Sequence, residues 1–140
     1  MQDLPIHPII GFQHSILLTK TLQFVEAKHY SNKEIWSNST PKVISQIKRY
    51  EDQIKKKETE ILSEYDNYIK SINNLFNLDL PKPIKIDPKV TLLIFGFDRD
   101  QLKGRAKELI KSNSEFKDVK VYLRGDISKL DTKVLWNVKE

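Results

Sequence analysis

The most constraining feature of this sequence is a stretch without glycine or proline that follows Pro41 and continues to Phe76. Apolar residues recur in it at intervals of three and four, as at Val43 and Ile47, and this spacing predicts an amphipathic helix. One unbroken helix would need about 36 residues and would be on the order of 54 Å long, more than a single small domain can cover. The lysines at 55–57 interrupt the apolar stripe. We therefore expect the helix either to break or to project and pair with another chain.

Two apolar segments precede this helix and predict the strands of a hairpin. Residues 6–12 and 16–30 are the two candidate strands, with the turn near Gln13, His14 and Ser15. In the second strand, alternation places two sets of side chains on opposite faces: Leu22, Phe24, Glu26 and Lys28 on one, and Val25, Ala27 and His29 on the other. Apolar residues therefore lead into a charged pair at the end of one strand face.

A strand, a helix and another strand follow towards the carboxyl end of the chain. Val90–Phe97 is almost continuously apolar, which predicts a buried central strand. Asp98 and Gln101 fit a capping box that opens a helix reaching about Ser112. Val119–Leu123 then predicts the next strand. A strand–helix–strand unit implies a parallel pair of strands joined by a right-handed crossover.

The length of 140 residues suits one domain of ordinary size. We expect residues 1–140 to form a single α/β domain, in which a central mixed β-sheet is flanked by helices, one of them long. No apolar run reaches the length of about 20 residues that a bilayer span needs, and no secretory signal is visible at the start. We therefore expect an intracellular, cytoplasmic protein without a membrane partner.

Composition narrows the chemistry that the chain can perform. The sequence has no cysteine, which excludes a thiolate nucleophile, a disulfide framework, an iron–sulfur site and a cysteine-based zinc site. Three histidines are too few for a histidine-rich metal cluster, so carboxylates would have to hold any metal, as they hold Mg²⁺ or Mn²⁺. The net charge of +5 favours a polyanionic partner only weakly, because a solvated lysine-rich surface explains it equally well.

The segment Glu26-Ala27-Lys28 is the strongest candidate for chemistry. A strand delivers Glu26 and Lys28 to the same side, about 6–7 Å apart along the backbone. A carboxylate there can hold a divalent metal, and a neighbouring ammonium can orient water or offset charge on a phosphate. The same triplet is also a common surface salt pair. Downstream, Gln46 and Tyr50 are four residues apart and therefore share a face of the predicted helix.

The order of these residues resembles that of the PD-(D/E)XK nuclease superfamily, which has the restriction-endonuclease-like fold, and in particular its Holliday-junction resolvases and RecB-type nuclease domains. The resemblance implies a Mg²⁺- or Mn²⁺-dependent DNA endonuclease. Glu26 and the Ala27 carbonyl would bind the metal, and Lys28 would position the attacking water. Gln46 and Tyr50 would support the site or touch the DNA. DNA, including branched or structured DNA, would be the partner, and the protein would act as a homodimer.

The chain departs from the family pattern at one position. The resemblance covers roughly residues 6–123, but Pro8 stands where the family has an Asp before two apolar residues. Asp3 and His7 are the only nearby substitutes, and no counterpart of the family's first helix and its acid is present. Loss of one metal ligand would severely weaken metal-dependent catalysis. The alternative is therefore a catalytically inactive nuclease-fold protein that binds nucleic acid or serves in an assembly.

Several other residues admit two interpretations. Lys103, Arg105, Lys107 and Lys111 could form a phosphate-binding face or only a solvated one. Trp36 could stack on a base, or it could anchor its loop on the body of the protein. Tyr50 could equally be a core residue with an exposed hydroxyl, and Gln46 an ordinary helix-surface residue.

Overall fold

The computed structural model describes residues 11–13, 20–36 and 40–129 of the chain. Their helices and strands follow one another in the order β1 (Gly11–Gln13), β2 (Thr21–His29), α1 (Lys42–Lys56), α2 (Glu58–Phe76), β3 (Lys85–Phe95), α3 (Arg99–Gln101), a π-helical turn η1 (Leu102–Ala106), α4 (Lys107–Ser112), a 3-10 turn η2 (Ser114–Phe116), β4 (Val121–Arg124) and a last 3-10 turn η3 (Ile127–Lys129). The predicted mixture of helices and strands is confirmed. Asp3, His7 and Pro8 lie outside the described residues.

The strands form one mixed sheet in the order β1-β2-β3-β4. β1 is antiparallel to β2, as the predicted hairpin requires. Gln13, which was predicted to lie in the turn, is a strand residue paired with Thr21, and His14 and Ser15 lie outside the described residues. β2, β3 and β4 are parallel to one another. The expected parallel strand–helix–strand unit is therefore confirmed. β3 is an internal strand, as predicted, and it begins at Lys85, earlier than predicted.

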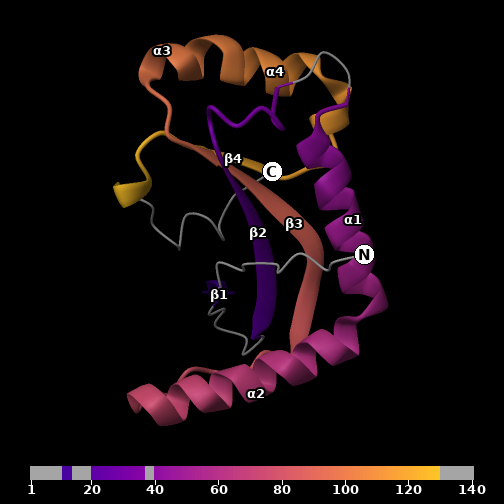
Figure 1. Cartoon of the computed structure of the whole chain (residues 1–140), viewed down its shortest axis with the longest axis vertical. Coiled ribbons are helices and arrows are strands. Elements are labelled where there is room, and N and C mark those ends of the chain that lie inside the picture. The colour runs from indigo at the N-terminus through magenta and orange to yellow at the C-terminus, as the bar shows by residue number, and fades with distance from the viewer. Residues whose placement is uncertain (1–10, 14–19, 37–39, 130–140) are drawn as a thin grey trace.

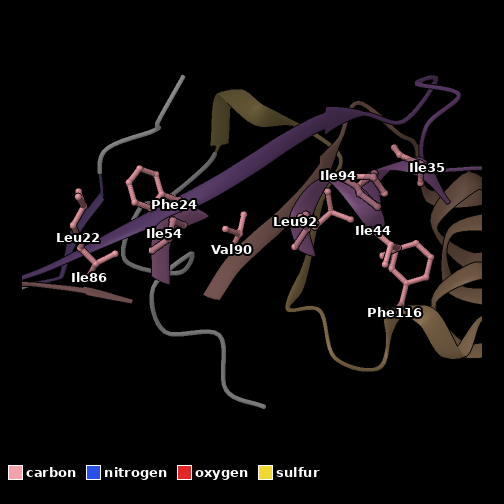
Figure 2. Close-up of a cluster of buried hydrophobic side chains, with 12 residues drawn as sticks. Leu22, Phe24, Ile35, Ile44, Ile54, Ile86, Val90, Leu92, Ile94 and Phe116 are labelled. Carbon is pink, nitrogen blue, oxygen red and sulfur yellow. The ribbon is translucent and has the colours of Figure 1, made fainter. Parts of the chain in front are cut away.

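A large buried cluster lies between one face of the sheet and α1 (Figures 1 and 2). Phe24, Val90 and Leu92 of the strands meet Ile44 and Ile54 of α1 in this cluster. Leu109 of α4 packs against the same cluster, so α1 and α4 lie on the same side of the sheet. In Figure 1, α2 crosses one end of the strands, and α3 and α4 cross the other.

The opposite face of the sheet carries a second, smaller cluster. Val25 and Leu93 are buried in it and pack with Phe95 and Tyr122, which are also strand residues. The alternation predicted for residues 22–28 is thus confirmed, because Leu22 and Phe24 belong to the large cluster and Val25 to the small one. Glu26 and Lys28 therefore lie on the face of β2 that carries the large cluster.

β3 contains extra residues near its start, where it pairs with β2. Leu22 pairs with Ile86 and Phe24 with Val90, so one residue of β2, Gln23, lies opposite three of β3, residues 87–89. The backbone amide of Val90 donates to the Glu51 carboxylate across 3.1 Å, and Lys89 Nζ lies 3.4 Å from the same carboxylate. Glu51 is buried in α1, so its carboxylate satisfies a buried amide at this irregularity.

Of the two outcomes expected for the stretch after Pro41, the break occurs: it divides into α1 and α2 at Lys57, so the single long helix expected for this fold is not formed. Lys57 has φ −117° and ψ 21°, outside the helical region, so the chain turns at the lysines that interrupt the apolar stripe. The two helices can then cover different parts of the sheet. Among the described residues, no helix is both long enough and apolar enough to span a membrane.

The capping box at the start of α3 is confirmed in both directions. The Asp98 carboxylate accepts from the Gln101 amide at 2.8 Å, and the Gln101 side-chain oxygen accepts from the Asp98 amide at 2.9 Å. The helical segment ends at Ser112, as predicted, but it is kinked at Gly104, whose φ of −91° and ψ of −113° are not helical. This cap fixes where the segment after β3 leaves the sheet.

Candidate functional site

Glu26 and Lys28 form an ion pair on β2, close to the carboxyl end of the strand. Lys28 Nζ lies 2.9 Å from Glu26 Oε1, and the two side chains are 11% and 20% exposed for Lys28 and Glu26, respectively. The prediction that they share one side of the strand is confirmed. The side chain of Ala27 between them is exposed and belongs to the opposite face.

A third charged residue, Glu34, completes this group and was not expected from the sequence. Its carboxylate lies 2.6 Å from Lys28 Nζ, although Glu34 belongs to the loop after β2. The side-chain oxygen of Asn32 accepts from the Glu34 amide, and the Glu34 carbonyl accepts from the Val43 amide at the start of α1. An asparagine two residues before Glu34 is a recognisable turn signal in the sequence, but it does not indicate that the Glu34 carboxylate pairs with Lys28.

Lys28 is held as an ammonium by these contacts. Burial alone lowers the pKa of Lys28, but the hydrogen bonds and charges of Glu34 and Glu26 outweigh it, so the pKa is raised above the ordinary 10.5. A protonated lysine has only donors to offer. In this arrangement Lys28 cannot accept a proton from water, and its single positive charge is shared by the two carboxylates instead.

The donor set of the described residues does not fit a resident divalent metal. The described part of the chain has no group of three or more histidines or acids that could hold one. The carboxylates of Glu26 and Glu34 are both bound to Lys28, whose ammonium lies where a bridging cation would have to lie. The possible further ligands Asp3 and His7 fall outside the described residues. We therefore derive no reaction step through Mg²⁺ or Mn²⁺.

Gln46 and Tyr50 share a face of α1, as their spacing predicts. Gln46 Nε2 donates to the Tyr50 hydroxyl across 2.9 Å, and both side chains are half-buried. Gln46 Oε1 is buried without a hydrogen-bond partner among the described residues. The described polar contacts of Lys28 are with Glu26 and Glu34, whereas the described hydrogen bond of Gln46 is with Tyr50. The support of the Glu26 site by Gln46 and Tyr50 stays a prediction.

A second candidate site, which we call the aromatic groove, opens beside the end of β2. It has a volume of about 530 Å³ and is lined by Tyr30, Ser31, Lys33, Trp36, Gln101 and Arg105. The first four follow β2 directly, and the last two belong to the segment after β3. The carboxyl ends of neighbouring parallel strands are where open α/β sheets place their ligands. The sequence singled out Trp36 and Arg105 separately, but no spacing in it indicated that they lie together in one groove.

Trp36 is fixed in the wall of this groove. Its indole nitrogen donates to the Tyr30 carbonyl across 2.6 Å, and the Tyr30 ring meets it edge-on with centroids 4.8 Å apart. The structure thus gives Trp36 the anchoring role that the sequence left open. The guanidinium of Arg105 lies 4.2 Å from the centroid of the same ring, a cation–π contact.

The four cations for which the sequence left open a phosphate-binding or a solvated face do not all lie together. Lys103, Lys107 and Lys111 are exposed, and the kink at Gly104 separates the first from the other two. Arg105 instead lies over Trp36. Within the described residues, the segment after β3 therefore carries three exposed lysines, Lys103, Lys107 and Lys111, which we call the lysine row. It also carries one arginine, Arg105, which belongs to the aromatic groove.

Comparisons with known proteins do not assign the site. The chain matches no family model, no curated protein and no solved structure. The function is therefore inferred from the geometry of the residues themselves.

Proposed function

We propose that this chain binds nucleic acid, with a restriction-endonuclease-like fold and with DNA as its partner. The observation that carries the proposal is the row of exposed lysines Lys103, Lys107 and Lys111 after β3. The contact between Arg105 and Trp36 brings this segment beside the loop after β2, which adds the exposed Lys33. Cationic side chains from two connecting segments thus gather at the carboxyl ends of the parallel strands.

Lysines in such a row bind phosphates as point charges. Each neutralised phosphate releases counterions, so affinity falls with salt, by a slope of about −0.9 per contact for duplex DNA. Contacts of this kind position a protein on the backbone without reading the sequence. The net charge of +5 acts in the same direction. We therefore expect binding that is strongly salt-dependent and indifferent to base sequence.

Phosphodiester hydrolysis is the second candidate function. The observation that favours it is the half-buried pair of Glu26 and Lys28, 2.9 Å apart at the end of β2. As a Mg²⁺- or Mn²⁺-dependent endonuclease, the chain would need a further ligand and the release of Lys28 from Glu34. Because the described residues supply neither, binding without catalysis has the better support.

The binding proposal is tested with two matched triple variants. One changes Lys103, Lys107 and Lys111 to glutamine, and the other changes the lysines at 55–57, which are equally exposed and carry the same total charge. We expect the first variant to bind labelled duplex DNA about 10-fold to 100-fold more weakly at roughly 0.1 M salt and with a shallower salt slope. The second variant should bind like the wild type. Equal losses in both variants, or no loss in the first, would refute the proposal.

Hydrolysis is tested separately on supercoiled plasmid and branched DNA with added Mg²⁺ or Mn²⁺. The wild type is compared with Glu26→Gln and Lys28→Ala. Metal-dependent cutting that both substitutions abolish would establish the endonuclease and replace the binding proposal. Binding without any cutting would support the inactive alternative. Cutting that neither substitution changes would indicate a contaminating nuclease.

The homodimer stays a prediction. The long unpaired helix that first suggested it is not formed, because α1 and α2 are separate helices. Its remaining basis is the resemblance to resolvases, which act as pairs. Sedimentation velocity with and without branched DNA would decide it, since a dimer has twice the mass of one chain.

A further inference from the structure

We propose that the aromatic groove binds an unpaired nucleotide, with its base on Trp36 and its phosphate on Arg105 and Lys33. This inference rests on the proposed binding of nucleic acid, and it specifies which part of a nucleic-acid strand would bind in the groove. The lining offers two aromatic rings and two exposed cations, and no acid takes part in it. A planar ring attached to an anion is the chemistry that such a lining matches.

The aromatic wall is held in place before any ligand arrives. The Tyr30 amide donates to the Phe95 carbonyl at 2.7 Å, which continues the pairing of β2 with β3 into the loop. The Trp36 amide donates to the Lys33 carbonyl, and the indole nitrogen is occupied by Tyr30. Ile35 beside Trp36 is fully buried and belongs to the large cluster (Figure 2). A ring fixed in this way loses little freedom when a base stacks on it.

Arg105 occupies the surface of Trp36 that a base would use. Its guanidinium is 4.2 Å from the ring centroid, yet its side chain is exposed and can leave the ring. A base that stacks on the indole would displace the guanidinium, which would then pair with the phosphate of the same nucleotide. This exchange replaces an exposed cation–π contact by stacking and a charge-assisted hydrogen bond.

The remaining polar groups of the groove fit the same ligand. The side-chain oxygen of Gln101 is used by the Asp98 amide, so Gln101 offers its amide nitrogen, a donor. Lys33 and Arg105 offer only donors as well. Bases inside a duplex have both faces covered by their neighbours, whereas an unpaired base has a free face for the indole. The groove therefore favours a single-stranded segment or a strand end over a duplex.

The test uses the fluorescence of Trp36 in a full-length Trp136→Phe variant, where Trp36 is the one remaining tryptophan. The probes are thymidine monophosphate, thymidine, inorganic phosphate and a short oligothymidylate. We expect quenching by the monophosphate and the oligomer, weaker binding of thymidine, and no quenching by phosphate. If the oligomer binds more tightly than the monophosphate, the source is a nucleic-acid strand; equal affinities would identify a free nucleotide. Quenching by phosphate alone, or by none of the probes, would overturn the inference.

Two variants separate the groove from the lysine row. In the same background, Arg105→Gln should weaken the monophosphate about tenfold but should not weaken thymidine, which has no phosphate and no longer has to displace the guanidinium. The variant that lacks Lys103, Lys107 and Lys111 should bind the monophosphate like its parent but lose duplex DNA. If duplex binding fails while the groove still binds the monophosphate, the proposed function is wrong and the groove is a nucleotide site. Wild-type affinity for the monophosphate in Arg105→Gln would refute the groove, whatever the duplex result.

Trp36→Leu provides a second, independent check in the otherwise unchanged protein, read by anisotropy of a labelled oligothymidylate. Loss of the stacking surface should weaken the oligomer at least about fivefold. Circular dichroism identifies a variant that fails to fold, and Arg105→Gln then decides the question, because its exposed side chain can be changed without disturbing the core. An unchanged affinity in a folded Trp36→Leu protein would also contradict the inference.

Discussion

The ammonium of Lys28 lies 2.6 Å from the carboxylate of Glu34 and 2.9 Å from that of Glu26, so one cation is shared by two acids. One acid comes from the same strand as Lys28, and the other from the loop that follows. The contact therefore ties the loop carrying Trp36 to the end of β2. It also explains how two acids can remain close together in a half-buried place.

Replacing Lys28 by methionine should destabilise the fold. The variant keeps most of the side-chain volume but leaves the carboxylates of Glu26 and Glu34 facing each other without a cation. We expect the free energy of unfolding to fall by about 1–3 kcal/mol, because the group is only partly buried. Urea denaturation measures this change. Lys33→Met, at an exposed position of the same loop, is the matched control and should stay within about 0.5 kcal/mol of the wild type.

The same substitution should create an affinity for divalent metal. With the ammonium gone, Glu26 and Glu34 can share Mn²⁺ or Mg²⁺ instead. We expect Mn²⁺ to raise the melting temperature of Lys28→Met clearly more than that of the wild type, since a ligand of the folded state stabilises it. Adding Glu26→Gln to Lys28→Met should abolish the difference. A wild type that Mn²⁺ stabilises as strongly would mean that Lys28 does not compete with the metal.

Glu51 should be important for stability, although it lies far from the candidate site. Its buried carboxylate accepts from the Val90 amide at the irregularity in β3. Glu51→Ala should lower the free energy of unfolding by about 1–3 kcal/mol, because that amide loses its partner. Glu51→Gln keeps an acceptor oxygen and should lose less. Equal losses in the two variants would show that the charge, rather than the hydrogen bond to Val90, matters.

Gly96 should not tolerate a side chain. It has φ +79°, and a Cβ at this position would overlap Nε2 of the His29 ring. Gly96→Ala should therefore cost about 1–3 kcal/mol through the left-handed backbone, with the clash in addition. The double variant His29→Ala/Gly96→Ala separates the two causes. It should recover the part due to the clash but keep the backbone cost, as thermal unfolding at fixed pH would show.

Stability should fall between pH 10 and pH 12 because of Tyr65. Burial, with smaller effects from the charges of Tyr68 and Glu64, raises the pKa of Tyr65 from 10.0 to about 12. In this window the unfolded chain loses the phenol proton while the folded chain keeps it, so the free energy of unfolding decreases as pH rises. The raised pKa of Lys28 acts in the same direction above pH 10.5.

Tyr65→Phe tests this pH dependence. The variant retains the ring that packs edge-on against Phe24, with centroids 6.0 Å apart, and lacks the titrating hydroxyl. Its alkaline loss of stability should be shallower than that of the wild type. A spectrophotometric titration should also lose the tyrosine that ionises at about pH 12. A variant with an unchanged stability profile would place the alkaline transition elsewhere.

Structural features that depend on residues close together in the chain could be predicted from the sequence. The faces of β2, the break near Lys57 and the capping box of Asp98 and Gln101 all follow from spacing along the chain. Glu26 and Lys28 are paired for the same reason, because alternate residues of a strand share a side. The irregularity in β3 could not be predicted, because it depends on Glu51, 39 residues away from Val90 in the sequence.

The sequence by itself therefore determined the order of strands and helices and placed one acid beside Lys28. Only the tertiary structure decided that Glu34 closes on the same lysine and that Arg105 lies over Trp36. These contacts join a strand or loop to a segment whose position is set by its packing on the sheet. The spacing of residues along the chain does not indicate which of these segments come into contact. For that reason the sequence indicated a metal-dependent nuclease at Glu26. The folded chain adds Glu34 to the pair of Glu26 and Lys28 and places the aromatic groove beside the end of β2, while the nuclease stays a prediction.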